Sequence, residues 1–98
     1  MARFFGVRSA RQDPYQARLD RMREAGRRRG SAEAKLFMRA LGRTKFQWHQ
    51  VHDRLSEVIA EGRAELEAQH ATDREIETWD VSCRIMFLLI AWRDWTQD

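Results

Sequence analysis

Apolar residues recur along this chain at steps of three and four, which is the period of an amphipathic α-helix. The longest series alternates steps of four and three over the middle of the chain and ends on a second step of four. Its members are Phe37, Leu41, Thr44, Trp48, Val51, Leu55, Val58, Gly62 and Leu66. Sustained heptad spacing of this kind predicts a long helix that packs along another helix.

A first helix is predicted ahead of this series, over residues 13–29. Asp13 can accept hydrogen bonds from the free amides of the first turn, and Pro14 suits the first helical position because it lacks an N–H. Gly30 is expected to end this helix, since glycine weakens a helix interior and favours its C-terminal end.

The central helix is predicted over residues 32–69. Gly42 is a typical C-terminal stop, and Thr44 with Gln47 three residues later has the pattern of a capping box. These two signals favour a break at 42–44 over one unbroken rod.

A last helix is predicted over 73–95, because Thr72 and Glu75 form a further capping box. This segment carries two apolar seams on different faces. One consists of Ile76, Trp79, Cys83, Met86 and Ile90, and the other of Val81, Ile85, Leu88, Trp92 and Trp95. A chain of 98 residues can cover only one of these faces, so we expect the other to bind protein. The predicted protein-interaction residues are Trp79, Val81, Ile85, Leu88, Trp92 and Trp95.

The predicted fold class is therefore all-α. We expect a small helical hairpin or three-helix arrangement with a long seam-bearing central helix and a basic N-terminal arm. The arm is assigned to residues 1–12 and a single helical domain to 13–98. The longest apolar run, 85–92, is too short to cross a membrane.

The single cysteine excludes an internal disulfide framework and suits a reducing compartment, so we expect a soluble, cytoplasmic protein. The arm has three arginines and no acid, a composition shared with mitochondrial transit peptides. Mitochondrial targeting therefore stays open as an alternative.

Charge is distributed unevenly between the two halves of the chain. Residues 1–50 hold 13 Lys/Arg against 4 Asp/Glu, a balance of +9, whereas residues 51–98 hold 5 against 11, a balance of −6. The basic half is typical of a phosphate-contacting surface, so nucleic-acid binding is one alternative function. Its candidate residues are Arg3, Arg8, Arg11, Arg18, Arg21, Arg27, Arg28, Arg29, Arg39, Arg43 and Lys45.

The acidic half contains a ridge of four carboxylates at steps of four, Asp53, Glu57, Glu61 and Glu65. Like charges at this spacing repel each other on a helix. The basic half can neutralise them within the chain or between subunits. Alternatively, the ridge stays exposed, and the protein is an inhibitor or nucleic-acid mimic that binds a basic groove.

Candidate chemistry is sparse. His49 and His52 lie one turn apart beside Asp53 but lack further ligands, so no metal site is predicted there. Glu67 and His70 form a Glu-x-x-His, the half-motif of ferritin-like di-iron proteins, and such a protein completed by dimerisation is a further alternative. No cofactor and no catalytic residue is predicted.

These observations together favour a small non-enzymatic helical protein that acts in interaction or assembly. We expect it to dock through its Trp-rich apolar helix and its basic arm onto its own copies or a larger complex.

Overall fold

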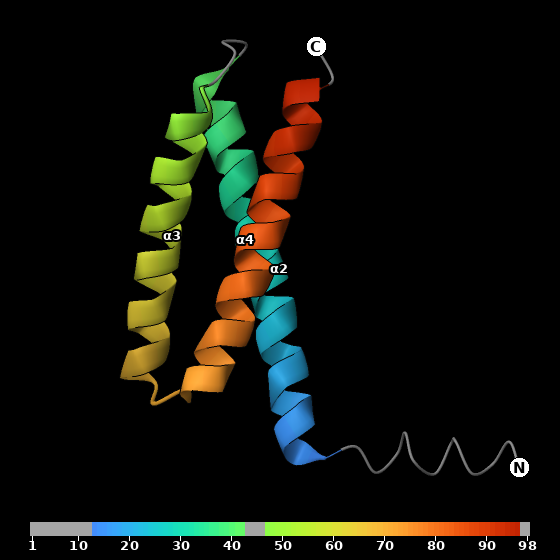
Figure 1. Cartoon of the computed structure of the whole chain (residues 1–98), viewed down its shortest axis with the longest axis vertical. Coiled ribbons are helices and arrows are strands. Elements are labelled where there is room, and N and C mark those ends of the chain that lie inside the picture. Colours follow the sequence, from blue (N-terminus) through green and yellow to red (C-terminus); the bar gives the residue numbers. More distant parts are fainter. Residues whose placement is uncertain (1–12, 43–46, 97–98) are drawn as a thin grey trace, which may run out of the picture.

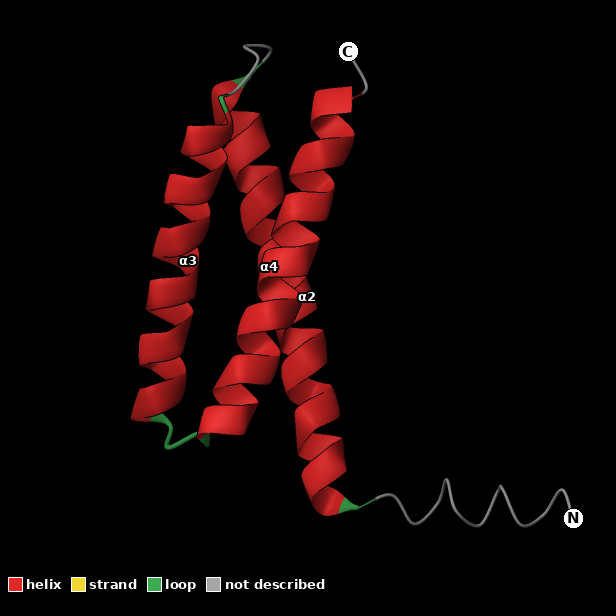
Figure 2. Cartoon of the chain, viewed as in Figure 1, coloured by secondary structure: helices red, strands yellow, loops and turns green. Residues whose placement is uncertain are grey.

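The computed structural model describes residues 13–42 and 47–96, and these residues form three α-helices and no strands (Figures 1 and 2). Helix α2 comprises Pro14–Leu41, α3 comprises Trp48–Ala68 and α4 comprises Asp73–Thr96. The predicted all-α fold class is confirmed. The segment 1–12, in which a basic arm was predicted, lies outside the described residues.

The three helices lie side by side, and successive helices run in opposite directions. Helices α2 and α4 run in the same direction and cross like the arms of an X, while α3 runs antiparallel to both (Figure 1). Among the described helices, α2 and α4 have the most extensive contact, and α3 contacts α4 less extensively. The last helix is thus antiparallel to the helix before it.

Two predicted helix starts are confirmed by their hydrogen bonds. Asp13 Oδ1 accepts a hydrogen bond from the Tyr15 amide at 2.9 Å, with Pro14 as the first residue of α2. At the start of α4 the Glu75 amide donates to Thr72 Oγ1 at 3.1 Å, and the Thr72 amide donates to Glu75 Oε1 at 2.7 Å. This reciprocal pair is a complete capping box.

The predicted end of the first helix at Gly30 is wrong, because α2 continues to Leu41. Gly26 and Gly30 are buried where α2 crosses α4. A Cβ added at Gly30 would overlap the backbone carbonyl oxygen of Cys83. The missing side chains allow the two backbones to approach closely, and the packing gained there offsets the low helix propensity of glycine. Residues 32–41, assigned to the central helix, therefore belong to α2.

A break separates α2 from α3 at the position that the sequence favoured. Helix α2 ends at Gly42, which has a φ of 66°, in the left-handed region that glycine adopts most readily. Residues 43–46 lie outside the described residues, so the capping role predicted for Thr44 does too. At the start of α3 the Gln47 amide donates to Gln50 Oε1 at 2.7 Å.

The core lies between α3 and the crossed pair. The predicted heptad series supplies the buried residues of α3, namely Val51, Leu55, Val58, Gly62 and Leu66, joined by Ile59. Helix α4 contributes Ile76, Trp79, Cys83, Phe87 and Ala91, and α2 contributes Leu19 and Ala34. Gly62 lies directly under the Trp79 indole, which would overlap a Cβ at that position.

His70 ends α3 in a conformation that favours glycine. Its φ is 63°, its amide donates to Glu67 O at 3.0 Å, and the Ala71 amide donates to Leu66 O at 3.0 Å. These two bonds form a Schellman motif, in which the left-handed position is usually glycine.

We therefore expect His70→Gly to stabilise the protein by about 1 kcal/mol, because glycine has no Cβ to oppose a positive φ. Urea unfolding followed by circular dichroism measures the change. His70→Ala is the control, and it should bring no such gain. Equal stabilities of the glycine and alanine variants would contradict the assignment.

Candidate protein-interaction surface

Four large apolar side chains lie exposed in a row on α4. Val81 is 45% exposed, Ile85 60%, Leu89 49% and Trp92 55%. They follow one another at steps of four, four and three, which places them on one face of the helix. We call these four residues the outward stripe.

The outward stripe stays exposed because the most deeply buried residues of α4 lie on its opposite face. Ile76, Cys83 and Phe87 point toward α2 and α3, and none of them is more than 4% exposed. A helix that is apolar around most of its circumference can bury only the side that faces its neighbours. The sequence prediction that one apolar face of this helix stays uncovered is therefore confirmed.

Trp79 does not belong to this surface, contrary to its place among the predicted interaction residues. It is only 4% exposed, and its indole packs on Gly62 of α3. Because glycine has no side chain, the six-membered part of the ring can approach the α3 backbone closely. Trp79 is a core residue that joins α3 to α4.

Two further predicted residues, Leu88 and Trp95, are partly covered. Both pack against the buried core. The ring of Trp95 lies 5.8 Å from that of Trp48, at an interplanar angle of 46°. Leu89 takes the outward position instead, although it was not among the interaction residues predicted from the sequence. Steps of four from Val81 would have found it, whereas the alternating heptad series selected Leu88.

The outward stripe ends in a cluster of three tryptophans at one end of the molecule. Trp92 stacks on Trp48 of α3, with ring centroids 6.1 Å apart and an interplanar angle of 29°. Trp92 nevertheless stays 55% exposed, so one part of its ring is held by α3 while the rest faces solvent. A ring held in place in this way loses little conformational entropy when a partner covers it.

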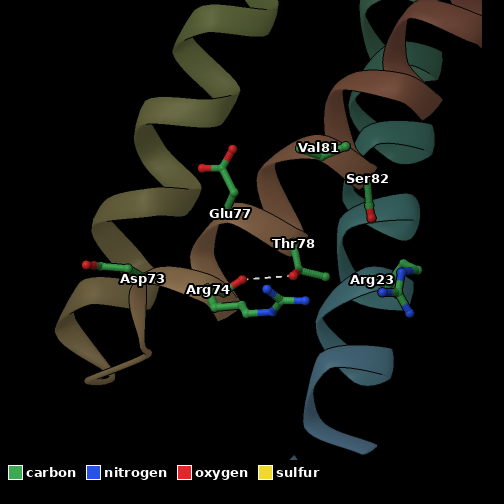
Figure 3. A pocket seen from close by; sticks show the side chains of 7 residues that line it. All are labelled: Arg23, Asp73, Arg74, Glu77, Thr78, Val81 and Ser82. Atoms are coloured by element: carbon green, nitrogen blue, oxygen red, sulfur yellow. Dashed lines mark hydrogen bonds between the residues drawn. The ribbon is translucent and has the colours of Figure 1, made fainter. Parts of the chain in front are cut away.

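Two open clefts between α2 and α4 border the stripe. The first has a volume of about 550 Å³ and is lined by Val81 and Ser82 of α4, among others, and by Arg23 of α2 (Figure 3). In this cleft the Thr78 hydroxyl donates to the Arg74 carbonyl at 2.8 Å and is thereby used within α4. The second, of about 370 Å³, is lined by Ser31, Lys35, Met86, Leu89, Ile90, Arg93 and Asp94. The stripe is thus a ridge with a groove beside it.

The arginines proposed to contact nucleic acid fall into different environments. Arg3, Arg8, Arg11, Arg43 and Lys45 lie outside the described residues. Arg18 pairs with Glu75 at 3.3 Å, and Arg27 and Arg28 both pair with Glu24, at 3.0 and 3.2 Å. Arg21 and Arg39 are exposed on α2 and form no ion pair within the described part of the chain.

Arg29 is taken up by an ionic network that links α2 to α3. Its guanidinium lies 2.9 Å from Glu33 and 3.4 Å from both Glu61 and Glu65. Arg54 completes the network through Glu33 at 2.9 Å. Burial alone would raise the pKa of Glu33, but hydrogen bonds from Arg54 and Arg29 outweigh it and hold that pKa below its usual value.

This network partly neutralises the acidic ridge inside the chain, one of the arrangements that the sequence left open. Glu57 pairs with Arg54 at 3.2 Å, and Glu61 and Glu65 share Arg29. Asp53 is exposed, with no ion pair to any described residue. The ridge therefore carries less free charge than its composition indicates.

The residues considered for chemistry do not assemble into a site. No three His, Cys, Asp or Glu residues of the described part of the chain lie close enough together to hold a metal ion. Glu67 and His70 accordingly find no third ligand there. Burial raises the pKa of the Cys83 thiol to about 11, so the thiol is protonated near neutral pH.

The chain matches no protein-family model, no curated protein and no solved structure. Among the described helices, none has an apolar stretch long enough to cross a bilayer. What the structure defines is a small three-helix protein with an exposed apolar and tryptophan-bearing face.

Proposed function

We propose that this protein is a non-enzymatic interaction subunit that binds a protein partner through the outward stripe of α4. The observation that carries the proposal is the row Val81, Ile85, Leu89 and Trp92, each about half exposed on consecutive turns of one helix. Between Val81 and Trp92 the row extends over about 17 Å of helix.

Isolated exposed apolar residues are common on soluble proteins, but contiguous rows of large ones usually mark binding sites. Tryptophan is also enriched among residues that dominate binding energy. Trp92 combines both features, because it extends the apolar row and is already held by Trp48. The partner is either further copies of this chain or a larger complex, and segment 1–12 is retained as a second attachment element.

Replacing Ile85 with aspartate tests the proposal. Without a partner to cover the stripe, we expect the wild-type chain to scatter light as species above the 11.7 kDa monomer and to bind a dye for apolar surfaces. Ile85→Asp should reduce both signals several-fold and leave the unfolding midpoint nearly unchanged, because residue 85 is 60% exposed.

Leu36→Asp is the matched control, since Leu36 is 55% exposed but lies on α2. It should leave assembly and dye binding as they are in the wild type. A wild-type chain that stays monomeric and binds no more dye than Ile85→Asp would overturn the proposal.

A further inference from the structure

Residues of opposite charge lie at the two ends of the outward stripe. Steps of four in both directions from Ile85 give Val81 and Leu89, and a further step in each direction gives Glu77 and Arg93. Residues at this spacing form one ridge along the surface of a helix. All five are exposed, and the side chain of Glu77 is 68% exposed. We call these five residues the symmetric row.

The symmetric row can pair with a copy of itself about a two-fold axis through Ile85. Ile85 lies at the centre of the row, with one large apolar residue on each side and one charged residue beyond it. In an antiparallel pair, each residue meets the residue that lies equally far from the centre on the other chain. Val81 then meets Leu89 of the second copy, and Glu77 meets Arg93 of the second copy.

We propose that the outward stripe binds a second copy of this chain, with the two α4 helices antiparallel and Ile85 on the two-fold axis. The inference rests on the proposed function and specifies its partner. Because the axis repeats every contact, the pair contains two Glu77–Arg93 ion pairs. A parallel pair would instead place Glu77 against Glu77 and Arg93 against Arg93. The charges at the ends of the row therefore select the antiparallel orientation.

The same pairing brings Trp92 to the open cleft near the N-terminal end of α4. Thr78 and Trp92 lie seven residues from Ile85 in opposite directions, so Trp92 of the second copy comes over Thr78. Thr78 and Val81 both line the cleft of about 550 Å³ (Figure 3). The Thr78 hydroxyl already donates to the Arg74 carbonyl, so an indole can cover it without leaving that donor unpaired. The cleft thus offers space for the tryptophan expected to anchor the interface.

The charges around this first cleft, at the Glu77 end of the row, agree with the antiparallel orientation. The charged residues that line it are Arg23, Asp73, Arg74 and Glu77. Arg23 pairs with Asp20 at 2.7 Å, which leaves one cation against two carboxylates. This balance favours the approach of Arg93 of the second copy. 

The second cleft lies at the Arg93 end of the row and has the opposite balance. The charged residues that line it are Lys35, Arg93 and Asp94. Two cations against one carboxylate favour the approach of Glu77 of the second copy. Within its own chain Glu77 lies 3.9 Å from Arg63, which is closer to Asp80, at 2.6 Å.

Exchanging the charges at the two ends of the row tests the orientation. Sedimentation equilibrium of the full chain measures the mass of the assembly and its dissociation constant. We expect a closed dimer of twice the 11.7 kDa monomer mass. Glu77→Arg and Arg93→Glu should each weaken the dimer about tenfold, because each places two like-charged pairs in the interface. The double variant restores both pairs with their signs reversed, and its dissociation constant should return to within about twofold of the wild type.

Glu67→Arg is the matched control. Glu67 is exposed on α3, and its replacement alters the net charge of the chain as much as Glu77→Arg does. It should leave the dissociation constant unchanged. Urea unfolding of the single variants should give midpoints close to that of the wild type, since both replaced residues are exposed.

The possible results separate this inference from the proposed function. A double variant as weak as the single ones, with Ile85→Asp still abolishing assembly, would overturn the antiparallel pair and leave the interaction surface standing. Single variants that dimerise as tightly as the wild type would do the same. A monomeric wild type that binds more apolar-surface dye than Ile85→Asp would overturn the second copy as the partner, but not the surface. If Ile85→Asp changes neither assembly nor dye binding, the proposed function itself is wrong.

Discussion

Gly30→Ala is expected to destabilise the protein by about 2–4 kcal/mol, although the same change in an exposed helix stabilises by about 1 kcal/mol. The new Cβ would overlap the Cys83 carbonyl oxygen and would lie 3.2 Å from its Cα and carbonyl carbon. These are backbone atoms, so no side-chain rotation can relieve the contact. Helices α2 and α4 would have to move apart along their whole crossing.

Urea unfolding followed by far-ultraviolet circular dichroism measures this loss, with Ala32→Gly as the control. Ala32 is exposed on the same turn of α2, and its change to glycine should cost only the ordinary propensity difference of about 1 kcal/mol. Gly26→Ala should resemble Gly30→Ala, because its Cβ would overlap the Trp79 carbonyl oxygen. A neutral or stabilising Gly30→Ala would show that the two helices do not approach as closely as described.

These glycines show which features of the fold local sequence patterns predict and which they do not. Local signals predicted the starts of α2 and α4 correctly, because a cap is made by residues two or three positions apart. Whether Gly30 ends a helix or lies in a helix crossing depends on a segment some fifty residues away. A local sequence pattern carries no information about that contact. Gly30 was therefore predicted to end the first helix.

The exposed apolar face of α4 was predictable as a face but not residue by residue. Two apolar seams on one helix, in a chain too short to cover both, predicted an uncovered face on α4. Which side chains it contains depends on where α3 lies along α4. Trp95 turns toward Trp48 and is partly covered, whereas Leu89, one residue beyond Leu88, remains 49% exposed.

The environment of each charged side chain likewise depends on which helix it faces. The composition predicted that the basic and acidic halves could neutralise each other, and Arg29 does so with Glu61 and Glu65. It lies next to Arg28 in the sequence, but neighbouring residues of a helix point about 100° apart. One of the two is therefore drawn to α3, while Arg28 is 80% exposed on the other side of α2.

Trp79→Ala is expected to be the most destabilising single change, at about 3–5 kcal/mol, because it empties the space between α3 and α4. Trp92→Ala is the matched control. Trp92 is 55% exposed and Trp79 only 4%, so the control should cost about 1 kcal/mol or less. If Trp79→Ala does not fold, Trp79→Phe keeps most of the buried ring area and should cost about 1–2 kcal/mol.

A double substitution isolates the contact between Trp79 and Gly62. In the wild type, Gly62→Ala should destabilise by about 2–3 kcal/mol, because its Cβ would overlap the six-membered part of the indole. In the Trp79→Ala protein the same change should instead stabilise by about 1 kcal/mol, since the ring is gone and alanine favours the helix. Gly30 differs from Gly62 because a Cβ at position 30 would overlap backbone atoms of Cys83, which no substitution removes. The two changes at 62 and 79 are therefore expected to couple by about 3 kcal/mol. Additive effects at the two positions would show that Trp79 does not lie on Gly62.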